Sequence, residues 1–97
     1  MTPRLDYIHH TVHFSVTAQN NPGSLPRILS VFEKASLCPD LVKSSSFTDG
    51  QLAVDIYTRG LEGALQDRLA AKLSSLVTVS HVRTEVILRP GRTKLAS

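Results

Sequence analysis

The chain has 97 residues, of which 41% are hydrophobic and 20% are charged. This length and composition are typical of one globular domain, and they argue against wholesale disorder and against a second domain. No run approaches the roughly 18 apolar residues of a membrane span, and no apolar segment follows Met1 as in a secretory signal. We therefore expect a cytoplasmic protein with no membrane partner. Its single cysteine, Cys38, excludes an internal disulfide and a cysteine-only metal site.

The formal net charge is +3, but the excess lies at the ends of the chain. Between His9 and Leu88, seven Lys and Arg side chains balance seven Asp and Glu side chains. Arg89, Arg92 and Lys94 follow in the C-terminal segment. Because no basic stripe crosses the central segment, we expect no nucleic-acid partner.

The first half of the chain predicts a strand, a turn and a helix. Apolar residues alternate with polar ones from Ile8 to Ala18, which is typical of a strand with one buried face. Turn residues then occupy 20–23. Because Pro26 is tolerated only in the first helical turn, we expect a helix from Gly23 or Ser24 to near Ser36. Its apolar stripe comprises Leu25, Ile28, Leu29, Phe32 and Ala35.

The second half predicts two strands joined by a hairpin, a helix and a last strand. We expect strands at 41–48 and 52–58, with Asp49-Gly50 in the turn between them. A helix is indicated by the spacing of Leu61, Leu65, Leu69, Leu73 and Leu76. Alternation from His81 to Leu88 indicates the fourth strand.

This order, βαββαβ, predicts an α+β ferredoxin-like sandwich, in which a four-stranded antiparallel sheet carries both helices on one face. We expect the domain to span residues 9–88. Residues 1–8 would form an N-terminal extension, and residues 89–97 a flexible basic tail.

The sequence offers no arrangement typical of catalysis. His9 and His13 share one face of the first strand while His10 points to the other. A third metal ligand would have to come from His81 or Cys38, and nothing in the sequence fixes either within reach. The carboxylates are scattered, with no pair placed to act as acid and base. We therefore expect a protein that is not an enzyme, with no catalytic residues, no metal and no cofactor.

The loop after the first strand is the best candidate for a binding site. Backbone N–H groups of Gly23 and Ser24 at a helix N-terminus suit a carboxylate. The amide oxygens of Asn20 and Asn21 suit an ammonium group, so the loop fits an amino acid. The alternative is that Asn-Asn-Pro-Gly is only a turn and a helix start.

The pattern Asn20-x-Pro22-Gly23-x-Leu25-x-Arg27-Ile28 in such a chain resembles the ACT domain, a small-molecule-sensing module of amino-acid metabolism. More narrowly, the chain is similar to the short regulatory subunit of acetolactate synthase (acetohydroxyacid synthase), which consists of one ACT domain. Residues 10–16, 21–31 and 69–82 support this resemblance, which runs from His10 to Leu88.

The resemblance implies a non-catalytic subunit of branched-chain amino-acid synthesis. Its partner would be a large subunit that uses thiamine diphosphate to condense pyruvate with a second 2-keto acid. Many family members confer inhibition by valine bound between paired ACT domains. Effector-binding positions would be Asn20, Asn21, Gly23, Ser24, Leu25 and Cys38. The alternative is a freestanding ACT homodimer that senses an amino acid.

One segment departs from the family. A Gly-x-Asn-Ile pattern would fall on residues 36–39, which here read Ser-Leu-Cys-Pro. Cys38 is a weak hydrogen-bonding group, and Pro39 has no N–H to donate. We therefore expect that valine binds weakly or not at all and that activation outweighs feedback inhibition.

Two surfaces are expected to bind partners. The second strand, with Pro39, Lys43 and the serines at 44–46, has the character of a sheet edge, so we expect a homodimer through it that proline at Ser45 would weaken. The polar face of the sheet is expected to bind the synthase, with Tyr57 as anchor. That face comprises His9, His13, Asp55, Tyr57 and Arg83.

Overall fold

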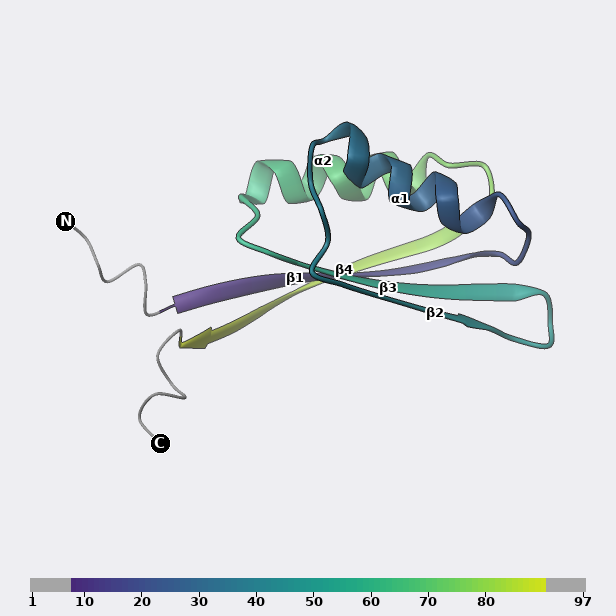
Figure 1. The fold of residues 1–97 in the computed structure, drawn as a ribbon, viewed down its shortest axis with the longest axis horizontal. Helices are drawn as coiled ribbons and strands as arrows, with labels where there is room; N and C mark the ends of the chain where they lie inside the picture. The colour runs from purple at the N-terminus through teal and green to yellow at the C-terminus, as the bar shows by residue number, and fades with distance from the viewer. Residues whose placement is uncertain (1–7, 91–97) are drawn as a thin grey trace.

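The computed structural model describes residues 8–90, and it confirms the predicted ferredoxin-like α+β fold (Figure 1). The elements follow one another as β1 (Ile8–Gln19), α1 (Ser24–Lys34), β2 (Leu41–Ser46), β3 (Gln51–Arg59), α2 (Gly63–Ser74) and β4 (Val79–Pro90). Within residues 8–90, no helix has the length and apolar character needed to cross a membrane.

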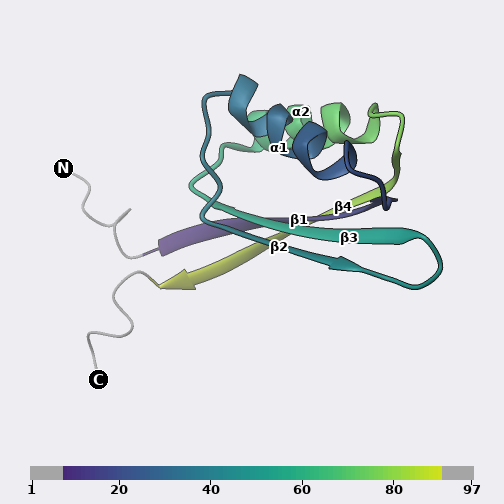
Figure 2. The same ribbon diagram turned by 45° about the vertical axis from the view of Figure 1, so that its right-hand side comes forward.

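The sheet is antiparallel throughout, with the strand order β2-β3-β1-β4. Both helices lie on one face of it, and the other face is open (Figures 1 and 2). The first strand therefore occupies the interior of the sheet, between β3 and β4, whereas β2 and β4 form its two edges.

The core lies between the helices and the inner face of β1 and β3. From Val12 to Ala18 of β1 and from Leu52 to Thr58 of β3, alternate residues are at most 6% exposed and face the sequence-predicted helical stripes. Phe14 of β1 meets Phe32 of α1 edge to face, with ring centroids 5.3 Å apart. Burying a side chain of this size contributes about 1.5–3 kcal/mol. The core comprises Val12, Phe14, Val16, Ala18, Ile28, Val31, Phe32, Leu52, Val54, Ile56, Leu61, Leu69 and Leu73.

The predicted apolar faces differ from the core at two places. Val86 and Leu88 continue the inward alternation of β4, yet they are 46% and 68% exposed. Both lie on the edge strand β4, whereas Val12, which pairs with Val86 from the interior strand β1, is fully buried. Conversely, Val31 is buried although it lies outside the predicted stripe, because α1 also turns a flank toward α2.

Several element boundaries also differ from the prediction. Residues Ile8 and His9 pair with Pro90 and Arg89, so the sheet includes residues expected in the extension and in the tail. The rest of that extension and the tail from residue 91 lie outside the described residues. The second strand ends at Ser46, two residues before the expected end, because the hairpin turn begins at Phe47.

The hairpin is a three-residue loop closed by Phe47 and Gln51. Phe47 N–H donates to the carbonyl of Gln51 at 2.8 Å, and Gly50 N–H donates to the carbonyl of Phe47 at 3.2 Å. Gly50 has φ +86°, a conformation in which glycine avoids the steric penalty of a side chain. The predicted Asp49-Gly50 turn is therefore confirmed.

The first helix ends in a Schellman motif. Leu37 N–H donates to the carbonyl of Phe32, and Ser36 N–H donates to that of Glu33, both at 2.9 Å. This geometry needs a left-handed residue, and Ser36 supplies it with φ +61°. Ser36 occupies the position at which the sequence departs from a family glycine, so a side chain is held where glycine is favoured.

We predict that Ser36→Gly raises the free energy of unfolding by about 0.5–1 kcal/mol, because it removes the left-handed penalty of an L-residue. Urea denaturation measures the change. The matched control is Ser44→Gly on β2, where the backbone is extended, and it should lower stability by about 0.5–1 kcal/mol. Equal effects of the two substitutions would contradict the assignment of strain to Ser36.

Candidate functional site

The loop of residues 20–23 lies at the end of the molecule that also holds the hairpin tip and the turn between α2 and β4 (Figure 1). Its backbone and that of Gln19 form hydrogen bonds with both of these segments. Gln19 N–H donates to the carbonyl of Thr78 at 2.9 Å, and Asn20 N–H donates to the carbonyl of Gly50 at 3.0 Å. The loop is therefore positioned by the β2–β3 hairpin and by the turn between α2 and β4.

Asn21 accepts hydrogen bonds from the two amides that were expected to bind a ligand carboxylate. Gly23 N–H donates to Oδ1 of Asn21 at 3.1 Å, and Ser24 N–H donates to its backbone carbonyl at 3.0 Å. Both amides are thus satisfied within the chain, in contrast to the expectation of free donors. A carboxylate would have to displace Asn21 to reach them.

The remaining loop residues divide into buried and accessible groups. Ser24 is fully buried, and its hydroxyl donates to the carbonyl of Gln19, which fixes the start of α1. Leu25 is half-buried and packs against the core, and its N–H has no hydrogen-bond acceptor in the described part of the chain. Asn20 is exposed. The groups open to a ligand are therefore the Asn20 side chain and the Leu25 amide.

Gly23 has an ordinary backbone conformation, with φ −87°, and its nearest neighbour is the flexible end of the Arg27 side chain, which can move aside, so neither feature requires glycine. A Cβ at this position would lie 2.7 Å from a terminal guanidinium nitrogen of Arg27. The guanidinium therefore occupies the space that the absent side chain leaves. A ligand approaching Gly23 meets this cation, which the sequence-predicted site did not include.

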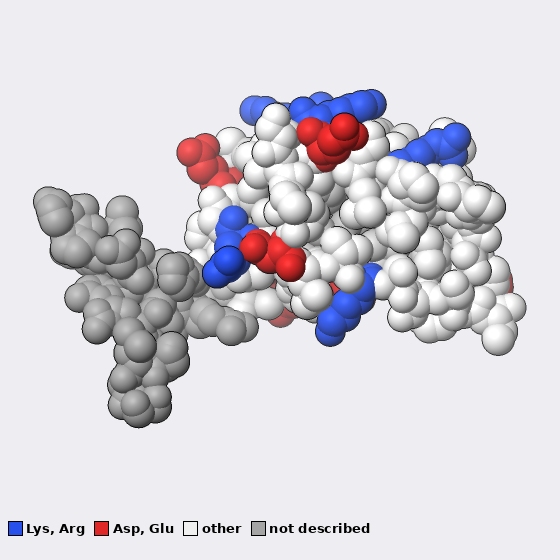
Figure 3. Space-filling view, in the orientation of Figure 1, with Lys and Arg blue, Asp and Glu red and all other residues white. Residues whose placement is uncertain are grey.

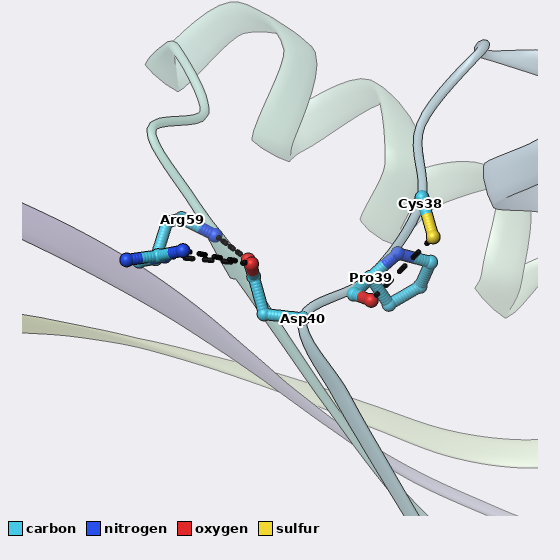
Figure 4. Close-up of polar contacts among 4 residues, drawn as sticks. All are labelled: Cys38, Pro39, Asp40 and Arg59. Atoms are coloured by element: carbon cyan, nitrogen blue, oxygen red, sulfur yellow. Dashed lines mark hydrogen bonds and ion pairs between the residues drawn. The ribbon is translucent and has the colours of Figure 1, made fainter.

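Cys38 follows the C-terminal end of α1, whereas the loop precedes its N-terminal end. Figure 4 shows Cys38 with its neighbours Pro39, Asp40 and Arg59. The helix has 11 residues, which corresponds to about 16 Å. Cys38 is exposed, and its Sγ lies 3.8 Å from the carbonyl oxygen of Pro39. Next to it, Arg59 N–H donates to Oδ2 of Asp40 at 2.7 Å and joins the start of β2 to the end of β3. The structure brings together the five predicted residues of the loop but not Cys38.

A second polar constellation occupies the middle of the open sheet face. His13 Nε2 lies 2.7 Å from Oδ1 of Asp55, and His13 Nδ1 lies 3.6 Å from Oε1 of Glu85. The imidazole stacks on Tyr57 at 4.4 Å between ring centroids, with the planes 8° apart. Lys43 Nζ lies 6.0 Å from the centre of the same tyrosine ring. We call these five residues the open-face cluster.

The sequence placed His13, Asp55 and Tyr57 on this face but did not include Glu85 or Lys43 in it. Their inclusion follows from register, since Glu85 pairs with His13 and Lys43 pairs with Asp55. His10 points to the opposite face, as expected, and hydrogen-bonds the carbonyl of Leu61. Among residues 8–90, no three His, Cys, Asp or Glu side chains converge as metal ligands.

Comparison with known proteins gives a family and a set of shared folds. A family described as an ACT-like domain matches residues 6–91. The ACT domain of GTP pyrophosphokinase from Chlorobium tepidum is 14% identical, with a TM-score of 0.67, over 79% of this chain and 86% of that one. The C-terminal domain of MgtC from Mycobacterium tuberculosis is 15% identical, with a TM-score of 0.65, over 80% and 87%.

A homoserine dehydrogenase from Thiobacillus denitrificans is 17% identical, with a TM-score of 0.59. The match covers 89% of this chain and 18% of that one. At these identities the similarity concerns the fold alone. No curated protein matches the sequence.

Proposed function

Because the chain belongs to the ACT-like domain family, we propose that it is the regulatory subunit of an acetolactate synthase. In this role it binds and activates a separate large subunit that uses thiamine diphosphate. ACT domains are regulatory modules rather than enzymes, so the chemistry lies in the partner. The resemblance of residues 10–16, 21–31 and 69–82 to such subunits motivates the choice among ACT proteins.

The observation that carries the proposal is the open-face cluster. A regulatory subunit needs an accessible surface that is ordered before its partner arrives, because ordering side chains on binding lowers affinity. Stacking on His13 holds the Tyr57 ring, and Asp55 in turn holds the imidazole. A rigid tyrosine at the centre of an uncovered sheet face is typical of a binding anchor.

The free edge of β2 supports pairing of protomers. Hydrogen-bonded and non-hydrogen-bonded pairs alternate along an antiparallel ladder. Counting from the bonded pair Phe47–Gln51, the N–H of Ser45 points to β3, whereas those of Ser44 and Ser46 point away from the sheet. The outward groups are available to a second copy. Proline at Ser45 would therefore remove a hydrogen bond between β2 and β3. Proline at Ser44 would remove an outward N–H, so Ser44 is the position that tests pairing of protomers.

The division of the predicted effector residues also favours a pair. The loop at 20–23 and Cys38 lie at opposite ends of α1, so the two cannot contact the same ligand within one protomer. In a two-fold dimer, the loop of one copy can face the Cys38 segment of its partner. The effector site in this proposal is consequently shared between two chains.

A freestanding homodimer that senses an amino acid is the alternative, and the free β2 edge favours it equally. Affinity purification from the native cell separates the two functions. The proposal expects a thiamine-dependent synthase to copurify in a fixed ratio. A pure homodimer without it, whose melting temperature rises with an amino acid, would support the alternative.

We predict that Ser44→Pro weakens self-association about tenfold or more, because each of the two chains loses an outward donor of the edge strand. Sedimentation velocity across micromolar concentrations measures the change. Ser44→Ala keeps the N–H and should leave association unaltered. An unchanged dimer with proline at Ser44 would place the interface elsewhere.

We predict that Tyr57→Ala raises the concentration needed to activate the synthase about tenfold or more, through loss of the stacked ring. Titration of the purified large subunit measures this effect. Tyr57→Phe keeps the ring and should retain most of the activation, and deletion of residues 92–97 should have the smaller effect. Activation that is lost with the deletion and normal with Tyr57→Ala would contradict the surface assignment.

We predict that valine, leucine and isoleucine bind more weakly than about 1 mM, which corresponds to about −4 kcal/mol. The Gly23 and Ser24 amides are taken by Asn21, and Cys38 and Pro39 add little hydrogen bonding. Isothermal calorimetry on the wild type and on Gly23→Asp provides the test. Tight binding of valine that Gly23→Asp abolishes would show that the loop opens for the ligand.

A further inference from the structure

A groove of about 380 Å³ runs between α1 and α2, on the side of the molecule opposite the open sheet face. Its floor is apolar, formed by Val31 and Leu76. Three cations surround that floor, namely Arg27 and Lys34 from α1 and Lys72 from α2. Figure 3 shows Lys and Arg side chains over the two helices, with Asp and Glu side chains beside them.

The three cations are not neutralised within the described chain. Among the side chains of residues 10–88, the ion pairs involve His13 and Arg59 but none of Arg27, Lys34 or Lys72. Glu33 is adjacent to Lys34 in sequence, but it lines a separate hollow beside Cys38. The groove therefore combines unneutralised positive charge with a small apolar floor, in which Val31 is buried and Leu76 is half-buried. A complementary partner would supply carboxylates and an apolar side chain.

The spacing of the cations suits a helix. Arg27 and Lys34 are seven residues apart, so their Cα atoms lie two turns and about 10.5 Å apart along α1, and the Arg27 guanidinium extends back toward Gly23. Two carboxylates seven residues apart on another helix have the same separation. A leucine between them would reach the floor at Val31 and Leu76, as in other helix-in-groove complexes.

Other anionic partners fit less well. A small inorganic anion would leave the apolar floor uncovered and would meet only exposed, hydrated cations. A nucleic acid would require a longer basic stripe with aromatic stacking groups, and the groove offers neither.

We propose that the groove between α1 and α2 docks an acidic amphipathic helix of a partner protein. This surface is separate from the β2 edge and from the open-face cluster. The inference therefore goes beyond the regulatory function proposed above and stands without it.

The test uses the full chain and a fluorescent helical peptide of about 14 residues. The peptide carries two glutamates seven positions apart with leucines between them. Fluorescence anisotropy at low salt should give saturable binding that weakens as salt is added, since charge attraction contributes to it. Replacing the glutamates by glutamines should weaken binding about tenfold or more.

Charge reversal on the protein locates the site. Lys34→Glu and Lys72→Glu should each weaken binding about fivefold or more. The matched control is Lys43→Glu, which makes the same change of net charge on the opposite face and should leave binding nearly unchanged. Val31 is buried and is left intact, and circular dichroism confirms that the variants fold.

Three results would overturn the proposal. If Lys43→Glu weakened binding as much as Lys34→Glu and Lys72→Glu, the peptide would be attracted only by the overall positive charge. If the glutamine peptide bound as tightly as the glutamate peptide, carboxylates would not contribute to recognition. Binding of a single-stranded oligonucleotide without binding of the peptide would assign the groove to nucleic acid. None of these measurements involves a synthase, so they leave the proposed function untouched.

Discussion

Burial of one face of β1 beneath both helices is the constraint on which the remaining structure depends. The strand pairs with β3 on one side and β4 on the other, so its alternation sets the inner and outer faces of the whole sheet. Phe14 joins that face to α1 through Phe32. With Phe14 inward, His13 must lie outward at the centre of the open face. The strand also ends at the loop of residues 20–23, which it delivers to the start of α1.

Most of this fold could be predicted from the sequence because its elements have distinct periods. Alternation of two marks β1 and β3, and the leucine spacing marks α2. The errors occur where burial depends on the place of a strand in the sheet. Val86 and Leu88 obey the alternation but are exposed on the edge strand β4, whereas Val12, which pairs with Val86, is fully buried. Local pattern carries no information about which strand lies at an edge of the sheet.

Less of the candidate site was predictable. The sequence interpretation treated the amides of Gly23 and Ser24 as free, whereas both donate to Asn21. Their capture depends on the rotamer of Asn21, which residue type alone does not determine. Membership of Glu85 in the open-face cluster required the register of β4, and the direction of the Ser44 N–H required the turn type of the hairpin. Each of these depends on pairing between distant segments.

The pairing of Ile8 with Pro90 brings the first and last described residues together at one end of the sheet (Figure 1). The loop of residues 20–23, the hairpin tip and the α2–β4 turn lie at the other end. A fluorescent protein or surface tether joined at Ile8 or at Pro90 would therefore lie at this end of the sheet, away from those loops. The same proximity makes the domain suitable for circular permutation, since a short linker across this end preserves every strand pair.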